Sequence, residues 1–364
     1  MTILFAGGED LDFTFLNGFN GATPGSLFGT ETTAGRFRSG YARHGIGTNS
    51  NLPLTAGNTF FRTGSNNVPP FAATSFWVTA RHWSSASTSS TGNFVFFRLN
   101  DASGISRVRV RTTSASGWGG PIVLEKVNAA GTVTTLLTSA LSFPSLSPAA
   151  PDKVDVFVNY TTTGTTFRLY NNGILLLDFA GDLTTDSVTS LGSVDFGVGP
   201  STNGGGAVQA TWSEVIVATT DTRTYNLVSQ VATANGNTHN FTAGATADIA
   251  AAVFTQGDAA PNVSATAGQI QQYQVTPALP AGSFALVSVV HKIRAVAGTT
   301  GPQKMDDMIR IGGTDYTSSD IPLTSGWATY SNNWDLNPNT GANWGIGDIV
   351  NASTLFNFGV KSVT

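Results

Sequence analysis

The 364-residue sequence contains no cysteine. This absence excludes disulfide bonds, thiolate metal ligands and thiol nucleophiles. Charged residues are also scarce, at 11% of the chain with a formal net charge of −4, where an average soluble domain has about 25%. Because there is no block of lysine or arginine, the chain lacks the electrostatic footprint of a nucleic-acid-binding protein. We therefore expect no nucleic-acid partner.

Long apolar runs are missing as well. No stretch approaches the roughly 20 apolar residues that a membrane-spanning helix needs. The first eight residues are followed at once by Glu9 and Asp10, which is not the pattern of a secretory signal peptide. We expect the protein to be synthesised in a cytoplasm and not to insert into a membrane.

Aromatic side chains, in contrast, are plentiful, with 23 Phe, 7 Trp and 7 Tyr. Disordered chains are poor in aromatics, so the chain is expected to fold. Its 41 glycines and its many threonines, serines and asparagines suit short strands joined by many turns. The composition indicates an all-β protein.

The clearest β pattern lies at residues 165–179. Two runs of aromatic and branched residues flank an Asn171-Asn172-Gly173 corner, whose residues tolerate the positive φ of a tight hairpin turn. In the preceding run, residues 153–160, Val154, Val156 and Val158 alternate with other side chains. Alternation with a period of two puts the valines on one face of a strand. These segments predict an antiparallel sheet whose inner face packs on a second sheet.

A second domain is expected after residue 222. From Asp221-Thr222-Arg223 onward the composition shifts to Ala, Thr, Asn and Gln, so we divide the chain into domains at 1–222 and 223–364. Residues 284–296 run without a breaker, a length that suits the central strand of a sandwich. The second domain is predicted to be a smaller antiparallel β-sandwich.

Several motifs in order resemble one known fold. A Tyr-Asn-Asn-Gly hairpin, a strand ending in Leu-Asp-Phe, a Phe-Gly-Val-Gly segment and a final Trp-Ser-Glu-Val-Ile-Val strand follow one another between residues 170 and 217. They resemble the second half of a laminin G-like, concanavalin A-like jelly roll. The resemblance implies such a sandwich for residues 1–222, with a concave face or rim loops of the kind that often bind carbohydrate.

A second resemblance touches both ends of the chain. The Asn-Pro-x-Thr-Gly-x-x-Trp segment at 337–344, the terminal Phe-Gly-Val-Lys at 358–361, and the openings at 6–13 and 35–43 are similar to virion structural proteins of tailed bacteriophages. The resemblance implies a non-enzymatic protein of the virion surface, in the tail or fibre apparatus or as a head decoration or spike. Its partners would be other virion proteins and copies of itself, and it would be located in the virion.

The number and spacing of the acidic residues agree with a protein that is not an enzyme. A retaining glycosidase needs two carboxylates about 5 Å apart, but the chain has only four glutamates, at positions 9, 31, 125 and 214, and no Glu-x-Asp-x-Glu pattern. Glu214 has no second carboxylate on its expected strand. The one local acidic cluster, Asp306, Asp307 and Asp315, is interpreted as turn residues of a hairpin. A glycan hydrolase is the least favoured function.

Metal and cofactor motifs are absent. The four histidines, at 44, 82, 239 and 291, are too far apart for a zinc motif, and His291, on an apolar strand, is predicted to be a paired core or interface residue. Laminin G-like domains often bind calcium, but no loop here collects three acidic residues. We expect no cofactor and assign no calcium ligand.

The alternative function is a carbohydrate-binding adhesin or receptor-binding protein that contacts host glycan. Trp118, Trp327, Trp334 and Trp344 are the candidates for stacking on sugar rings, and the competing interpretation of each is packing in a core or interface. Arg107, Arg109 and Arg111 share one face of a strand. They predict either a solvent-facing ladder or a surface for an acidic glycan or partner subunit.

Overall fold

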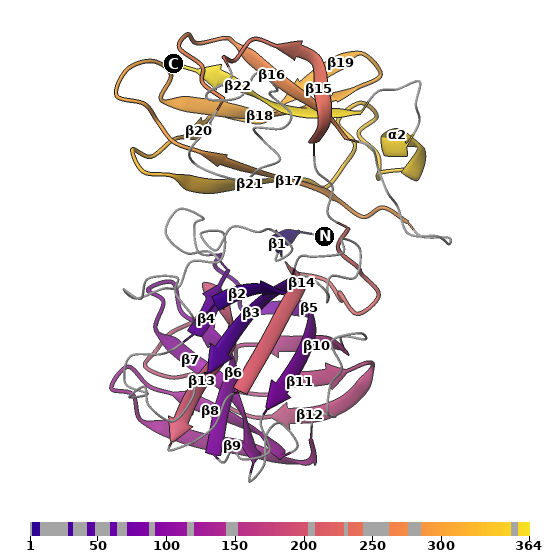
Figure 1. The fold of residues 1–364 in the computed structure, drawn as a ribbon. Helices are drawn as coiled ribbons and strands as arrows, with labels where there is room; N and C mark the ends of the chain where they lie inside the picture. The colour runs from indigo at the N-terminus through magenta and orange to yellow at the C-terminus, as the bar shows by residue number, and fades with distance from the viewer. Residues whose placement is uncertain are drawn as a thin grey trace. The chain divides into compact units, whose positions relative to one another are not determined.

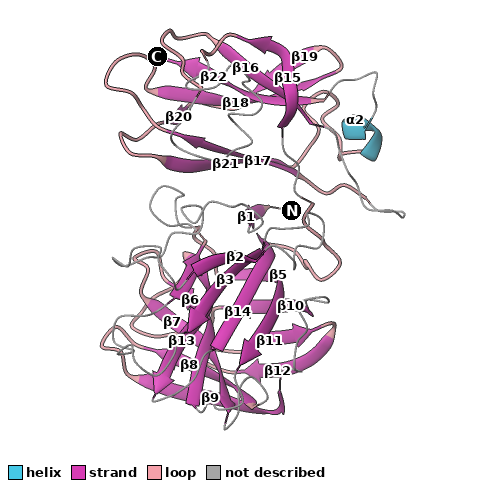
Figure 2. Cartoon of the chain, viewed as in Figure 1, coloured by secondary structure: helices cyan, strands magenta, loops and turns pink. Residues whose placement is uncertain are grey.

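The computed structural model of the protein describes residues 2–7, 28–31, 42–47, 59–63, 71–86, 92–114, 120–142, 152–202, 208–228, 232–242, 262–275, 285–350 and 356–364. Strands dominate these residues, and the helix among them is the single turn α2 (Ile346–Val350) (Figure 2). The prediction of an all-β chain is confirmed. The chain divides into two compact units, Met1–Leu227 and Val228–Thr364.

The N-terminal unit contains an eight-stranded antiparallel sheet. Its strands run in the order β12-β11-β10-β5-β14-β3-β2, with β1 also paired to β14 (Figure 1). The bounds are β1 (Ile3–Gly7), β2 (Phe28–Glu31), β3 (Ala42–Gly47), β5 (Ser75–Ala86), β10 (Asp152–Asn159), β11 (Thr165–Asn171), β12 (Ile174–Ala180) and β14 (Val208–Ala218). Non-consecutive strands lie side by side, so residues far apart in sequence share one surface.

A second, six-stranded sheet completes this unit. It has the order β4-β13-β6-β7-β8-β9, with β4 (Thr59–Arg62), β6 (Gly92–Asn100), β7 (Ser106–Ser114), β8 (Pro121–Val127), β9 (Val133–Ser142) and β13 (Ser193–Thr202). One hydrophobic core joins the inner faces of both sheets, with Phe96 and Val110 from one and Val156 and Phe167 from the other. Fully burying such a side chain contributes about 1.5–3 kcal/mol. The predicted jelly-roll sandwich is confirmed.

The hairpin expected at 165–179 is formed by β11 and β12. Asn172 and Gly173 have φ values of 48° and 81°, the left-handed conformation that a two-residue hairpin turn requires. The Asn172 side chain also accepts a hydrogen bond from the backbone N–H of Lys153 at 2.8 Å. The corner therefore ties the hairpin to β10.

The C-terminal unit is a smaller sandwich. Its larger sheet has the order β15-β16-β22-β18-β19, with β20 paired to β18, and its second sheet pairs β17 with β21. The bounds are β15 (Ala232–His239), β16 (Ile270–Val275), β17 (Val289–Ala295), β18 (Lys304–Ile311), β19 (Thr314–Thr317), β20 (Ile321–Pro322), β21 (Ala328–Trp334) and β22 (Asn357–Val363). The second β-sandwich is also confirmed.

One strand of this unit differs from its prediction. Residues 284–296 were expected to form a central strand, but β17 begins only at Val289 and, among the described residues, pairs with β21 alone. A run of apolar residues shows that a segment is buried and does not show how many neighbours it pairs with.

The division between the units falls after Leu227, whereas the sequence places it after residue 222. Packing explains the position, because Thr222 is fully buried on the N-terminal unit.

Candidate functional site

Strand alternation creates two very different faces on the eight-stranded sheet. On β5, Phe76, Val78 and Ala80 point into the core. Their neighbours Trp77, Thr79 and Arg81 consequently lie on the outer face. On β10 the three valines point inward in the same way, which leaves Lys153, Asp155 and Phe157 outward. Aromatic, basic and acidic groups thus share the outer face.

The strand register places these outward groups in rows. Asp155 lies between Thr79 on β5 and Tyr170 on β11, and the Thr79 hydroxyl donates to Asp155 Oδ1 at 2.5 Å. The rings of Trp77 and Tyr170 stack with their centroids 6.2 Å apart. Lys153 Nζ lies 3.8 Å from Asp155 Oδ1. An aromatic pair, a cation and a carboxyl therefore meet on three adjacent strands.

Asp155 is an unusual carboxyl for an outer face, because only 2% of it is exposed. Burial raises its pKa, and the hydrogen bond from Thr79 and the charge of Lys153 oppose that rise. Desolvation penalises the charged form of an acid, so a larger fraction of the carboxyl is protonated at a given pH. A buried carboxyl whose pKa is raised is a candidate for proton transfer.

Glu214 reaches the same face through a β-bulge. The register of β14 on β5 shifts between Ser213 and Ile216, and Glu214 has a φ of 49°, a left-handed conformation that is uncommon for a residue with a Cβ atom. Its carboxylate lies 3.6 Å from Arg81 Nε and is 2% exposed. Bulges and strained backbone of this kind concentrate next to functional sites.

Residues 221–226, here called the strap, run across this face. Thr222 approaches Thr79, with the two hydroxyl oxygens 2.6 Å apart. The guanidinium of Arg223 lies 4.9 Å from the ring centroid of Trp77 and 5.0 Å from that of Tyr170. The strap therefore covers the outward groups described above.

The three arginines on β7 form ion pairs with carboxylates of the same unit. Arg109 and Arg111 each donate through Nε to Glu125, at 2.5 and 2.6 Å. Arg107 donates to Asp101 at 2.7 and 2.8 Å. The carboxylates that hold these guanidinium groups lie on neighbouring segments, and the expected contact with an acidic glycan or a partner subunit stays a prediction.

The tryptophans singled out in the sequence occupy different environments. Trp344 is 4% exposed and lies in a hydrophobic core, against which Trp334 packs, half-buried. Trp327 is half-buried, with the guanidinium of Arg294 5.5 Å from its ring centroid. Trp118 lies outside the described residues. Trp334 and Trp344 thus share one hydrophobic cluster, and the contact of the four tryptophans with glycan stays a prediction.

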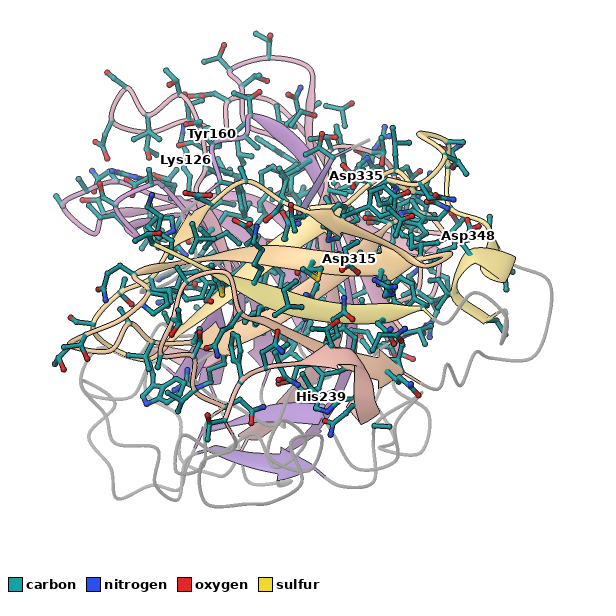
Figure 3. All side chains as sticks on the ribbon, turned by 90° about the horizontal axis from the view of Figure 1, so that it is seen from above. Lys126, Tyr160, His239, Asp315, Asp335 and Asp348 are labelled. Atoms are coloured by element: carbon teal, nitrogen blue, oxygen red, sulfur yellow. The ribbon has the colours of Figure 1, made fainter. Side chains whose placement is uncertain are left out.

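The acidic cluster of the C-terminal unit was expected in the turn of a hairpin. The hairpin forms between β18 and β19, but the acidic residues lie in its strands, so their expected position in the turn is wrong. Asp306 and Asp307 lie inside β18 and Asp315 lies in β19. Asp315 (Figure 3) accepts from Gln272 at 2.7 Å and from Arg310 at 2.6 Å. Turn chemistry was inferred from composition, and composition does not place a residue relative to the Gly312-Gly313 corner.

Asp307 is the centre of a buried polar network in this unit. It is fully buried and accepts hydrogen bonds from His291 Nδ1, from Asn332 Nδ2 at 2.8 Å and from Trp334 Nε1 at 2.6 Å. The prediction that His291 is a paired core residue is confirmed. The network joins β17 and β21 to β18, so it links the two sheets of the sandwich.

The described part of the chain contains no cluster of three or more His, Asp or Glu side chains that could hold a metal ion. No helix in that part is long and apolar enough to cross a membrane.

The first unit is thus a jelly-roll β-sandwich with a polar and aromatic outer face. No family model matches the sequence, and no curated protein matches it. Solved structures do match. An endo-β-1,4-glucuronan lyase from the fungus Trichoderma reesei is 11% identical, with 60% of this chain and 96% of that chain covered and a TM-score of 0.42.

Two further matches are an alginate lyase and a protein described as cellulose-induced. The alginate lyase A1-II′ of polysaccharide lyase family 7 is 13% identical, with 54% of this chain and 84% of that chain covered and a TM-score of 0.36. The cellulose-induced protein Cip1 is 16% identical, with 53% and 85% covered and a TM-score of 0.35. At these values the matches describe the fold and carry no argument about substrate.

These neighbours contradict the prediction of a non-enzymatic virion structural protein. Those named above are polysaccharide lyases and a cellulose-induced protein, and none is a phage protein. Only the jelly-roll part of the expected resemblance is supported. The loop at 337–344 shows why the motif misled, because Asn337 Oδ1 accepts from the N–H of Asn339 at 2.8 Å and Trp344 Nε1 donates to the carbonyl of Trp334 at 2.5 Å. Such contacts stabilise a turn in any sandwich.

The outer-face site is hard to recognise in the sequence, because Asp155 and Glu214 lie on strands that are distant in sequence. The signal that was available is the pair of outward aromatics, Trp77 and Tyr170, on strands whose inward residues are uniformly apolar.

Proposed function

We propose that the N-terminal unit is a glycan-processing domain whose working surface is the outer face of the eight-stranded sheet. The observation that carries the proposal is the presence of two buried carboxyls, Asp155 and Glu214, on a face that also bears Trp77 and Tyr170. Sugar rings stack on aromatic side chains through their apolar faces, while their hydroxyl groups bond to charged groups nearby. Each kind of group is present on this face.

The two carboxyls take different roles in the proposed reaction because their surroundings differ. Asp155, with its raised pKa, is the proton-transfer group. Glu214 instead lies beside the guanidinium of Arg81. Two carboxyls with such different surroundings are the arrangement from which acid and base roles arise.

Strand spacing restricts the reaction. Asp155 is on β10 and Glu214 is on β14, and β5 lies between these two strands. Neighbouring strands are about 4.8 Å apart, so the backbones of β10 and β14 are about 10 Å apart. Retaining glycosidases hold their carboxyls about 5–5.5 Å apart. We therefore propose cleavage without a glycosyl-enzyme intermediate, by direct hydrolysis or by elimination.

The test is a turnover assay of the full chain on a panel of neutral and uronate-containing polysaccharides. New reducing ends report any cleavage, and the ultraviolet absorbance of an unsaturated sugar reports elimination. We expect Asp155→Asn to lower the rate by about 10²–10⁴-fold, the usual contribution of general acid–base catalysis.

The matched control is Asp178→Asn. Asp178 lies on β12 of the same sheet, but its side chain is exposed and forms an ion pair with the exposed Arg168. Its replacement is expected to leave the rate unchanged. A wild-type chain that cleaves no polysaccharide, or an Asp155→Asn variant with the full rate, would refute the proposal.

A further inference from the structure

The strap at residues 221–226 contacts nearly every group that the proposed site would use. Lys153 Nζ donates to the carbonyl oxygens of Thr222, Arg223 and Tyr225, the last at 2.9 Å. Arg81 Nη2 donates to Asn226 Oδ1 at 3.1 Å. Lys153 and Arg81 are therefore both bound by oxygen atoms of the strap.

The aromatic groups are covered in the same way. The planar guanidinium of Arg223 lies over both Trp77 and Tyr170, where a flat ligand group would stack. Asp221 holds that guanidinium through a bond of 2.6 Å from Nη2 to Oδ2. Below it, Thr222 reaches the Thr79 hydroxyl, which in turn binds Asp155. The strap thus presents oxygen acceptors to the cations and a planar group to the rings, as a sugar would.

Apolar packing contributes little to holding the strap in place. Arg223, Thr224 and Asn226 are exposed, and Thr222 is its one fully buried residue. Segments held mainly by exposed polar contacts open at low free energy, whereas core strands open only with the whole unit. Displacing the strap would leave β5, β10 and β11 intact, because their core lies on the opposite face.

We infer that the strap is a built-in competitor that occupies the glycan-binding face, and that it must leave the face before a polysaccharide can bind. This inference rests on the proposed function of the same face. It adds a regulatory step, because the apparent affinity for glycan is the intrinsic affinity reduced by the fraction of chains whose strap is open.

Arg223→Ala is the variant that tests the strap without altering the face. A cation–π contact is worth about 0.5–2 kcal/mol, so its loss should raise the open fraction, and with it the apparent association constant for glycan, by about 2- to 30-fold. Arg310→Ala is the control, because Arg310 is an arginine of the C-terminal unit that pairs with Asp315 and lies outside the proposed glycan-binding face. It is expected to change neither quantity.

Two measurements on the full chain decide the outcome. Amide hydrogen exchange of residues 219–227, without glycan, reports strap opening, and calorimetric titration with the polysaccharides of the panel reports binding. Faster exchange together with tighter binding in Arg223→Ala supports the inference. Unchanged exchange would show that the strap is a fixed part of the unit, and this alone overturns the inference whatever the glycans do.

The remaining outcomes separate the inference from the proposed function. Faster exchange with equal glycan affinity in wild type and Arg223→Ala would mean that the strap does not compete, so the inference falls and the proposed function stands. Faster exchange with no glycan bound by either chain would overturn the proposed function, and the inference with it.

Discussion

Replacing Asp307 by alanine should lower the unfolding free energy of the C-terminal unit far more than replacing an exposed residue. The Asp307 side chain is fully buried and accepts from three side chains, His291, Asn332 and Trp334. Asp307→Ala leaves these three donors without their acceptor inside the sandwich. Each unsatisfied buried group costs about 1–3 kcal/mol, and breaking a buried pair costs about 3–5 kcal/mol in all. Because contributions within one network are not additive, we expect a loss of about 3–5 kcal/mol.

The assay is amide hydrogen exchange followed by peptide, because two units need not unfold as one two-state system. Peptides from β17 and β18 report the C-terminal unit, and peptides from β10 report the N-terminal unit as an internal reference. Exchange should accelerate in the first group and stay constant in the second.

Asp320→Ala is the control for this prediction. Asp320 also carries an ion pair in the C-terminal unit, with Lys304 at 3.1 Å, but both side chains are close to half exposed. Exposed pairs contribute about 0–1 kcal/mol, so little change is expected. If Asp307→Ala destabilises the unit by less than about 1 kcal/mol, the reasoning from the buried network is wrong.

Three further outcomes are expected in the N-terminal unit. Burial raises the pKa of Asp155 above its ordinary 3.8, so the folded state binds the proton more tightly. The resulting stabilisation is present below pH 3.8 and is lost as the pH rises through the raised value, and Asp155→Asn should flatten that part of the stability curve in denaturation from pH 3 to 8. Gly173→Ala should lower the unfolding free energy by about 1–2 kcal/mol, because a Cβ meets nothing within 4 Å but φ is 81° and the left-handed conformation is strained. The control Gly326→Ala lies in the C-terminal unit, in open space and without a positive φ, and should change the denaturation midpoint of that unit little. Glu125→Ala should destabilise by about 2–4 kcal/mol in urea unfolding, more than the loss of either arginine it binds, because it leaves two half-desolvated guanidinium groups without their shared carboxylate.

Local patterns explain how much of the fold was predictable. The hairpin at β11 and β12 depends on the Asn172-Gly173 corner and on neighbouring residues, and it formed as expected. The pairing of β17 was not predictable, since three strands, β18, β19 and β20, separate it in sequence from its partner β21 and an apolar run looks the same in either sheet.

The functional prediction failed for a related reason. One of the motifs behind that prediction, the loop that ends at Trp344, lies in a turn, and turn sequences reflect backbone geometry more than function. Glu214 appeared to lack a catalytic partner because its own strand carries no second carboxylate. The structure instead brings Asp155 to the same face from β10, with β5 between the two strands.

The sequence by itself determined the all-β class, the inward faces of β5 and β10, and the hairpin turn, because alternation and turn chemistry act between residues close together in the chain. Only the tertiary structure decided what the outward faces do. Thr79 and Asp155 are 76 positions apart, and Arg81 and Asn226 are 145 apart. Whether such groups meet depends on strand order and register, which the burial of the whole core selects and no local pattern encodes.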